Sequence, residues 1–216
     1  LKGDQDVARA AVKQNPEALE FASSALRDDR ELVVEAVTAD GAVIRFASDR
    51  LRQDRELTMT AVRSDGMALY YAEPFRGDAA VVAEAAAQNG MALGAATSEL
   101  RRSCGADKAF MMRAVTSNGL SLKFASVALR ADHDLCLAAV TQTGFALEYA
   151  APEVRGENKE VVLAAARANG QALQHASAAL RADRECCIAA CSRDGSALVH
   201  VSNEMRTREN RATYRE

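Results

Sequence analysis

Thiol and imidazole side chains occur close together toward the C-terminal end of the chain. Cys187 and Cys191 stand four positions apart, and His175 and His200 lie nearby in the sequence. Residues four apart share one face of a helix. Because thiolate and imidazole are zinc ligands, these four residues are candidates for a zinc-binding module. The competing interpretation is structural, since buried free cysteine behaves as a small hydrophobic side chain.

Two kinds of charged residue recur along the chain and could also take part in chemistry. The arginines could bind an anionic partner through forked hydrogen bonds. We expect instead that they satisfy nearby acidic groups and backbone carbonyls, and that the aspartates are helix caps rather than paired general acids. The recurring arginines are Arg27, Arg52, Arg76, Arg101, Arg130, Arg155, Arg181 and Arg206.

These residues belong to an internal repeat. Residues 29–41 read DRELVVEAVTADG and residues 54–66 read DRELTMTAVRSDG. A fixed period of this kind indicates a repeat architecture. Pro16 takes the place of the closing glycine in a divergent first copy, and the glycines are Gly41, Gly66, Gly90, Gly119, Gly144, Gly170 and Gly195. The spacing defines repeats near residues 1–27, 28–52, 53–76, 77–104, 105–130, 131–155, 156–181 and 182–206, with a short insertion around Ser103 and Cys104.

The first part of each repeat predicts a helix with a start, an apolar face and a stop. An Asp or Asn stands twelve residues before the glycine, where it is a preferred N-cap. Apolar residues eight and four before the glycine, such as Val33 and Val37, share one helical face. The residue five before the glycine is always alanine, which predicts a crossing of two helices with almost no gap. We expect the glycine, which tolerates a positive φ, to end the helix.

Two shorter elements complete each repeat. Leucine or isoleucine three residues after the glycine position, with alanine or valine six residues after it, predicts a helix of about two turns that depends on its neighbours. Pro74 and Pro152 follow a position that is serine in most repeats, which indicates a separate capped turn at the end of the repeat.

The pattern predicts an all-α fold, namely an α-solenoid of eight stacked helix-turn-helix units of about 25 residues, in a single array over residues 1–206. Residues 207–216, TRENRATYRE, have no apolar stripe and predict a polar tail. Leu1-Lys2 matches the end of a repeat, so we expect the array to extend further back and the N-terminus to be incomplete.

Composition and charge argue against several classes of protein. The net charge of −3 is opposite in sign to the basic footprint of a nucleic-acid-binding protein. No apolar run is long enough to span a membrane. Five cysteines without a disulfide spacing favour a reducing, intracellular compartment, either cytosol or organelle. Cys104, in the insertion, is the thiol that we expect to be most exposed.

Alignment of the repeats favours the structural interpretation of the cysteines and histidines. Cys187 and Cys191 occupy the positions of Val33 and Val37. His175 and His200 occupy a position that is Phe or Tyr in five other repeats, so they are aromatic substitutes. We therefore expect no bound metal and no cofactor.

One variable position suggests a partner-binding surface. The residue directly after the glycine is apolar in four consecutive central repeats, namely Met67, Met91, Leu120 and Phe145. A solvent-facing row of this kind suits the apolar surface of a partner. An inward-facing row is only core, as most apolar stripes of helical period are.

In tandem, the pattern D-x-E-h-h-x-x-A-V-x-x-D/N-G-x-A-L-x-x-A-S-x-x-L-R resembles the domain-of-unknown-function family 4116. One copy of that domain, about fifty residues, resembles two repeats here, so the resemblance covers four copies from residue 1 to about residue 206. The first repeat departs at Pro16, and the eighth replaces a core valine by Cys191. The resemblance implies the helical fold and supplies no catalytic residues.

We expect a non-catalytic protein-interaction scaffold, either free or as a peripheral or stabilising subunit of a larger assembly, including an organellar or photosynthetic one. Extended repeat surfaces serve such roles. The partner is then another protein or protein complex, and we expect neither nucleic acid nor a small-molecule ligand. One alternative is a nucleic-acid-binding helical repeat, which predicts basic or aromatic residues at a fixed exposed position in each repeat, and we find none. The other is the zinc-binding module of Cys187, Cys191, His175 and His200.

Overall fold

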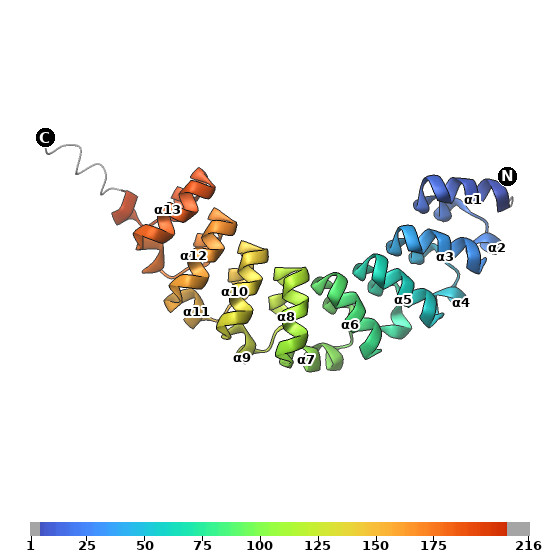
Figure 1. The fold of residues 1–216 in the computed structure, drawn as a ribbon, viewed down its shortest axis with the longest axis horizontal. Coiled ribbons are helices and arrows are strands. Elements are labelled where there is room, and N and C mark those ends of the chain that lie inside the picture. The colour runs from blue at the N-terminus through green and yellow to red at the C-terminus, as the bar shows by residue number, and fades with distance from the viewer. Residues whose placement is uncertain (1–4, 207–216) are drawn as a thin grey trace, which may run out of the picture. The chain divides into compact units, whose positions relative to one another are not determined.

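The computed structural model of the chain describes residues 5–206, and every element in this range is helical, which confirms the all-α solenoid (Figure 1). Each repeat begins with an α-helix of ten residues, which we call its long helix. The long helices are α1 (Gln5–Gln14), α3 (Arg30–Ala39), α5 (Arg55–Ser64), α6 (Ala79–Gln88), α8 (Lys108–Ser117), α10 (His133–Gln142), α12 (Lys159–Ala168) and α13 (Arg184–Arg193). No helix among the described residues is long and apolar enough to cross a membrane.

A side-chain cap and a buried apolar face explain where each long helix begins and why it is stable. In α3, Oδ1 of Asp29 accepts the backbone N–H groups of Glu31 at 3.0 Å and Leu32 at 3.1 Å. Behind this cap, Leu32 and Ala36 are completely buried. The predicted Asp or Asn cap is present in every repeat from the second to the eighth. Asp4, its counterpart in the first repeat, lies outside the described residues.

A 3₁₀-helix of six residues follows each long helix, which confirms the predicted short helix of two turns. Residues at i and i+3 lie above one another in a 3₁₀-helix. Gly41, Ile44 and Ala47 therefore share one side, and all three are buried. The 3₁₀-helices are η1 (Pro16–Phe21), η2 (Gly41–Phe46), η3 (Gly66–Tyr71), η5 (Gly90–Ala95), η6 (Gly119–Phe124), η7 (Gly144–Tyr149), η8 (Gly170–His175) and η10 (Gly195–His200).

A short closing turn ends each of the first seven repeats, as predicted. The hydroxyl of Ser48 accepts the backbone N–H of Leu51 at 3.3 Å, and Pro152 stands at the first position of its turn. The closing turns are α2 (Ser24–Arg27), α4 (Asp49–Arg52), η4 (Glu73–Phe75), α7 (Ser98–Ala106), α9 (Val127–Arg130), α11 (Pro152–Glu157) and η9 (Leu180–Ala182).

The prediction that the repeat glycine ends the long helix is wrong. None of the described glycines has a positive φ. The long helix α3 ends instead at Asp40, whose extended backbone (φ −144°, ψ 107°) also caps the following 3₁₀-helix. Glycine is needed for a different reason: a Cβ on Gly41 would lie 2.1 Å from the backbone oxygen of Ala61 in the next repeat. The close crossing predicted from the invariant alanine is therefore present. The alanine of one repeat lies against the glycine of the preceding repeat.

The helices form two compact bodies, which meet in the chain at Ser103 and Cys104. We call them the N-terminal body and the C-terminal body. The division falls within α7, where the sequence places its short insertion. Each body is a stack of four repeats, and the arrangement of all eight in a single array stays a prediction.

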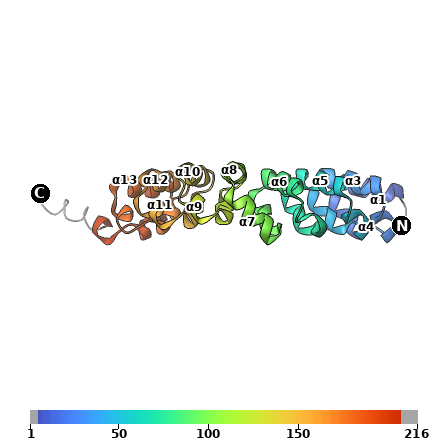
Figure 2. The same cartoon turned by 90° about the horizontal axis from the view of Figure 1, so that it is seen from below.

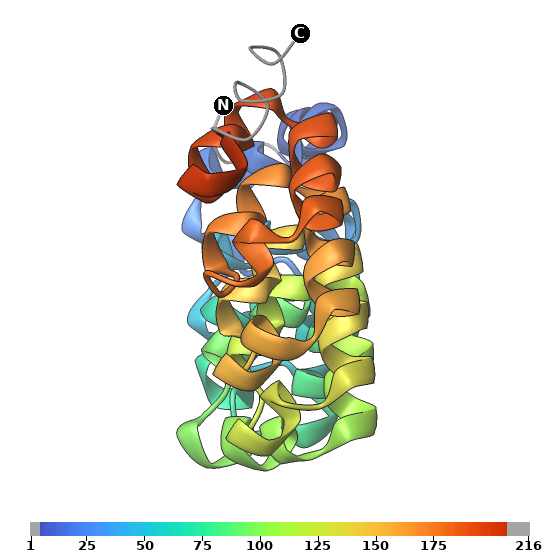
Figure 3. The same ribbon diagram turned by 90° about the vertical axis from the view of Figure 1, so that its left-hand side faces the viewer.

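Within each body the long helices form one layer and the 3₁₀-helices form a second. In Figure 1, α1, α3, α5 and α6 lie side by side in chain order. The closing turns lie on one side of the long helices. In Figure 2, α4 lies below the row of α3, α5 and α6, and α9 and α11 lie below α10 and α12. Figure 3 views the C-terminal body from its α13 end. A backbone hydrogen bond recurs between neighbours: the N–H of Ser48 donates to the carbonyl of Arg27 at 2.9 Å, and the N–H of Ala151 donates to that of Arg130 at 2.8 Å.

Candidate partner-binding face

The 3₁₀-helices of each body present one side to solvent, which we call the 3₁₀ face. It is formed by the first, fourth and fifth residues after the glycine position. The third residue is buried in the first seven repeats, and the sixth residue is buried in the second to eighth. The first and fourth residues lie above one another because three residues make one turn. Neighbouring repeats are linked across this face, since the guanidinium of Arg45 donates to the carboxylate of Glu17 at 3.1 Å.

Large aromatic side chains are exposed on the 3₁₀ face of the N-terminal body. Phe21 is 65% exposed, Tyr70 40% and Tyr71 39%. Leu69, in the same 3₁₀-helix as the two tyrosines, is completely buried. The fold therefore buries an apolar side chain of this 3₁₀-helix and leaves the three aromatic side chains in contact with solvent. Exposed aromatic groups of this kind are typical of surfaces that bind a partner.

The four residues predicted to bind a partner all lie on a 3₁₀ face. Met67 and Met91 belong to the N-terminal body, and Leu120 and Phe145 belong to the C-terminal body; all four side chains are half-buried. The ring of Phe145 contacts that of His175 in the next repeat edge to face, with 6.2 Å between the centroids. The position therefore lies at the surface and also contacts the neighbouring repeat. Its role in binding a partner stays a prediction.

One fixed position carries aromatic side chains in seven of the eight repeats, and the fourth repeat has Ala95 there. The fifth residue after the glycine position is aromatic in most repeats and is exposed or half-buried in each of them: Phe21, Phe46, Tyr71, Phe124, Tyr149, His175 and His200. Two cations lie on these rings. The guanidinium of Arg45 is 4.5 Å from the ring centroid of Phe46, and the ammonium of Lys123 is 4.9 Å from that of Phe124. The sequence contains this signal, because the spacing of these residues from the glycine position is constant.

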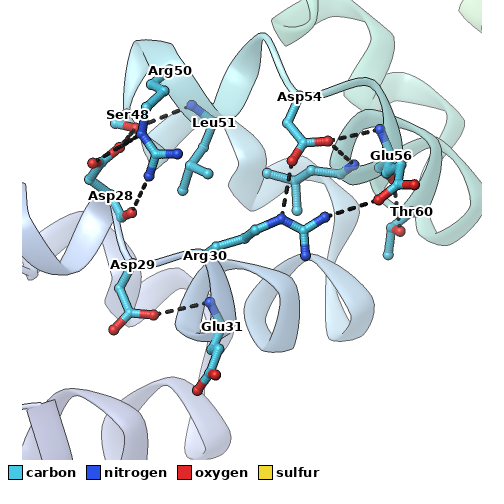
Figure 4. A network of polar contacts seen from close by, with 11 residues as sticks. Asp28, Asp29, Arg30, Glu31, Ser48, Arg50, Leu51, Asp54, Glu56 and Thr60 are labelled. Carbon is cyan, nitrogen blue, oxygen red and sulfur yellow. Dashed lines mark hydrogen bonds and ion pairs between the residues drawn. The ribbon is translucent and has the colours of Figure 1, made fainter.

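Ion pairs join the beginnings of neighbouring long helices (Figure 4). The guanidinium of Arg30 donates to Asp54 at 3.2 Å and to Glu56 at 3.2 Å. Asp54 is also the cap of α5, and the backbone N–H of Leu57 together with Arg30 lowers the pKa of its carboxyl. The same position supplies the pairs Arg55–Asp78, Lys108–Asp132 and Lys159–Asp183. These carboxylates are already bonded as acceptors, so they are structural caps, as predicted from the sequence.

Acid is expected to destabilise the protein through these caps. The hydrogen bond from Arg55 and the backbone N–H of Val81 lower the pKa of Asp78 from 3.8 to about 2. A carboxyl whose pKa is lowered in the folded state stabilises the fold at pH values above its unfolded-state pKa. This stabilisation is lost as the pH falls toward the folded-state pKa. We therefore expect a constant Tm between about pH 7 and 5 and a falling Tm between about pH 4 and 2. Thermal denaturation monitored by circular dichroism measures this, and Asp78→Asn, which keeps the cap, should flatten the decrease, whereas an unchanged profile would contradict the assignment.

Several of the repeated arginines form hydrogen bonds or ion pairs with other residues of the same fold. Arg76 donates to the carbonyl of Tyr70, and Arg101 donates to those of Gly94 at 3.1 Å and Ala96 at 3.4 Å. Arg52 pairs with Asp49. The Nε atoms are buried without a hydrogen-bond partner among the described residues in Arg27, Arg52, Arg76, Arg130, Arg155 and Arg181. Because Nε is covered, these guanidinium groups could contact an anionic partner only through their Nη atoms.

The structure does not bring the four candidate zinc ligands together. The thiol of Cys187 donates to the carbonyl of Arg181 at 3.2 Å, and Nε2 of His200 is 2.7 Å from Oε1 of Gln171. His175 contacts Phe145 instead. Residues 5–206 contain no group of three or more His, Cys, Asp or Glu side chains placed to hold a metal ion.

Burial should make two of the five thiols unreactive. It raises the pKa of Cys136 to about 11 and that of Cys186 to about 12. Cys104 and Cys191 are only half-buried, so the thiol expected to be most exposed is one of two. Because the thiolate is the nucleophile, we expect iodoacetamide at about pH 8 to label Cys104 and Cys191 at least about 100-fold faster than Cys136 and Cys186. Peptide mass spectrometry measures the rates, and equal labelling of Cys136 would contradict its packing.

Comparison with known proteins identifies the repeats. The model of the family described as "Domain of unknown function (DUF4116)" matches residues 29–76, 54–101, 107–155 and 158–206. Each match spans two repeats, the first two matches overlap, and the first repeat lies outside the matched residues. No curated protein and no solved structure gave a match. The matches cover most of the chain, in register with its caps and glycines, and the chain belongs to the DUF4116 family.

Proposed function

We propose that the chain is a non-catalytic protein-interaction scaffold that binds a partner protein through its 3₁₀ faces. The observation that carries this proposal is the exposure of Phe21, Tyr70 and Tyr71 in a fold whose core positions are completely buried. Tyrosine combines a large apolar ring with a polar group at low entropic cost, and it is enriched at the centres of protein interfaces. A stack of repeats extends such a surface along each body without any catalytic group.

The state of the reactive groups supports a role without catalysis. A general acid needs a pKa near the working pH, whereas bonding lowers the pKa of Asp54, Asp78, Asp132 and Asp183. A thiol nucleophile needs a lowered pKa, whereas burial raises that of all five cysteines. These groups are better suited to holding the repeats together than to chemistry.

A second candidate is binding of single-stranded nucleic acid, and the aromatic position favours it. Bases stack on aromatic side chains, and Arg45 and Lys123 place a cation on two of the rings. The same faces carry the carboxylates of Glu17, Glu20 and Glu148, which repel a phosphate backbone. The charge of the surface therefore favours a protein partner.

Capture of partners by matched variants tests the proposal. Immobilised full-length chain and a Tyr70→Ala/Tyr71→Ala variant are compared by affinity purification with quantitative mass spectrometry. Val127→Ser is the control, because Val127 is 74% exposed in a closing turn away from the 3₁₀ face. We expect the double variant to lose at least about 90% of the partner that the wild type and the control both retain, since interface aromatics dominate binding energy. Equal recovery by the double variant would overturn the proposal, and tight binding of an oligouridine probe in a fluorescence anisotropy titration would replace it with the second candidate.

The apolar residues that follow the glycines give a further prediction. Replacing Met91 and Leu120 by serine is expected to weaken partner binding by at least about tenfold. Because both side chains are half-buried, each change should cost only about 1 kcal/mol of stability. Circular dichroism and the same capture assay measure the two effects. A collapse of thermal stability would show that these residues act as core, contrary to the proposal.

A further inference from the structure

A hollow lies beside the two exposed tyrosines of the N-terminal body. Its volume is about 350 Å³, and residues of the closing turn α4 in the second repeat and of η3 and η4 in the third repeat line it. Tyr70, Tyr71 and Pro74 belong to this lining, and all three side chains are exposed. The first and fourth repeats pack on either side of these two repeats, so the exposure of the tyrosines does not come from an end of the stack.

Aromatic rings of neighbouring repeats stand at a fixed spacing along this surface. The guanidinium of Arg45 is 4.5 Å from the ring centroid of Phe46 and 5.8 Å from that of Tyr71, so the two centroids lie at most about 10 Å apart. Glu17 accepts a hydrogen bond from Arg45 at 3.1 Å, which fixes the guanidinium beside both rings. In the fourth repeat Ala95 stands at the ring position, so the row of rings ends at Tyr71.

The spacing of the rings matches one turn of a polyproline II helix. That helix has three residues per turn and rises about 3.1 Å per residue, so its side chains recur on one side about every 9 Å. Neighbouring packed helices lie about 8–10 Å apart, whereas side chains on one side of a β-strand recur about every 7 Å. Residues one turn apart in a polyproline II segment can therefore each contact a ring of a successive repeat.

The hydrogen-bond donors in the hollow favour the same occupant over an α-helix. A polyproline II segment has no internal hydrogen bonds, so its carbonyl groups need partners, and proline has no N–H group to satisfy. The hydroxyls of Tyr70 and Tyr71 and the amide of Gln53 can donate to such carbonyls. An α-helix bonds its own carbonyls and would leave these donors covered without partners, which is costly.

The charges in the hollow balance one another. Two carboxylates and two guanidinium groups belong to the lining, namely those of Asp49, Glu73, Arg52 and Arg76. Arg52 pairs with Asp49, and Arg76 donates to the carbonyl of Tyr70. A surface without net charge complements an uncharged segment, whereas a nucleic acid would bring its phosphate chain against the two carboxylates.

From the ring spacing, the donors and the balanced charge we propose that this hollow and the ring of Phe46 bind a proline-rich segment in the polyproline II conformation. The inference rests on the proposed partner binding through the 3₁₀ face and specifies the chemistry of the partner. One proline stacks on Tyr71 and another, one turn away, stacks on Phe46, while the tyrosine hydroxyls donate to carbonyls of the segment. Because such a segment is extended before it binds, little conformational entropy is lost.

A fluorescence anisotropy titration of the full chain with fluorescein-labelled decaproline tests the inference. We expect saturable binding in the micromolar range. Tyr71→Ala should weaken it at least about tenfold, and Tyr71→Phe, which keeps the ring and removes the donor, about threefold. Tyr149→Ala is the matched control, because Tyr149 stands at the same position in the sixth repeat and belongs to the C-terminal body. Circular dichroism verifies that the variants are folded. Absence of binding, or an equal loss caused by folded Tyr149→Ala, would overturn the inference.

Two further labelled peptides test whether the conformation of the probe matters. A Gly-Ser decapeptide is flexible, and an alanine-rich peptide of about 20 residues forms a helix. We expect both to bind at least about tenfold more weakly than decaproline, and equal binding of either would overturn the inference.

The capture assay separates failure of this inference from failure of the proposed function. If decaproline does not bind but the Tyr70→Ala/Tyr71→Ala variant still loses its partner, the polyproline II inference is wrong and the proposed function stands. If decaproline binding depends on Tyr71 but the double variant retains every partner, the proposed function is wrong and the hollow remains a polyproline II site.

Discussion

Replacing Gly41 by alanine is expected to destabilise the N-terminal body by about 3 kcal/mol, or roughly 10 °C in Tm. The added Cβ would lie 2.1 Å from the carbonyl oxygen of Ala61 and 2.8 Å from the backbone nitrogen of Asp65. Both contacts are with backbone, so relief requires that the whole helix α5 moves away from η2. Neighbour contacts supply much of the stability of a repeat stack, and the loss should therefore exceed that of an ordinary surface change. Thermal and urea denaturation followed by circular dichroism measure it.

Gly195→Ala is the matched control for this prediction. Gly195 begins η10 just as Gly41 begins η2, but a Cβ at Gly195 meets nothing within 4 Å. Alanine in place of a glycine with negative φ reduces the entropy of the unfolded chain and stabilises by about 0.5 kcal/mol. Opposite signs are thus expected for the same substitution in the second and the eighth repeat, measured at low protein concentration. Equal effects at both positions would contradict the close crossing.

Thr58→Val and Ser121→Ala are expected to stabilise the protein by about 1 kcal/mol each. Both side chains are completely buried, and neither hydroxyl has a hydrogen-bond partner among the described residues. Other repeats carry Val33 and Val82 at the first position and alanine at the second, so the replacements fit the local packing. Removing an unsatisfied buried hydroxyl recovers its desolvation cost. The two residues belong to different bodies, so we expect the effects to add to about 2 kcal/mol in the free energy of unfolding.

Thr60→Val separates this effect from a general preference for valine. The hydroxyl of Thr60 donates to the carbonyl of Glu56 at 3.0 Å in the same helix (Figure 4), so its loss recovers no desolvation cost. We expect a change within about 0.5 kcal/mol at this position. Urea denaturation of the three single variants and the double variant measures the series. Destabilisation by Thr58→Val would show that its hydroxyl is satisfied in solution.

The order and type of the local elements could be predicted because each depends on residues close together in the sequence. Asp29 caps α3 through its own neighbours, and Ser48 caps its closing turn in the same way. The spacing of three between Gly41, Ile44 and Ala47 predicts a short helix, and it also fits the 3₁₀ geometry that the structure shows. In a 3₁₀-helix this spacing forms a single buried side.

The candidate surface was only partly predicted. Met67 and Phe145 were chosen because they vary at a regular position, and the structure places both at the surface while the ring of Phe145 contacts His175. The exposed Tyr71 was missed, because a regularly spaced aromatic residue is equally typical of a core. Exposure depends on which side of a two-turn helix faces the neighbouring layer, and no local pattern contains that information.

The sequence by itself determined the repeat, its boundaries, its caps and its helical class, since these follow from short-range hydrogen bonding and apolar periodicity. Only the tertiary structure decided why the glycine is required. The glycine at 41 has an ordinary φ, and its constraint comes from Ala61 in the next repeat, which lies twenty positions away in the chain. Tertiary packing likewise decided that Leu198 is exposed while Leu173 is buried, because burial depends on whether another repeat lies against the residue.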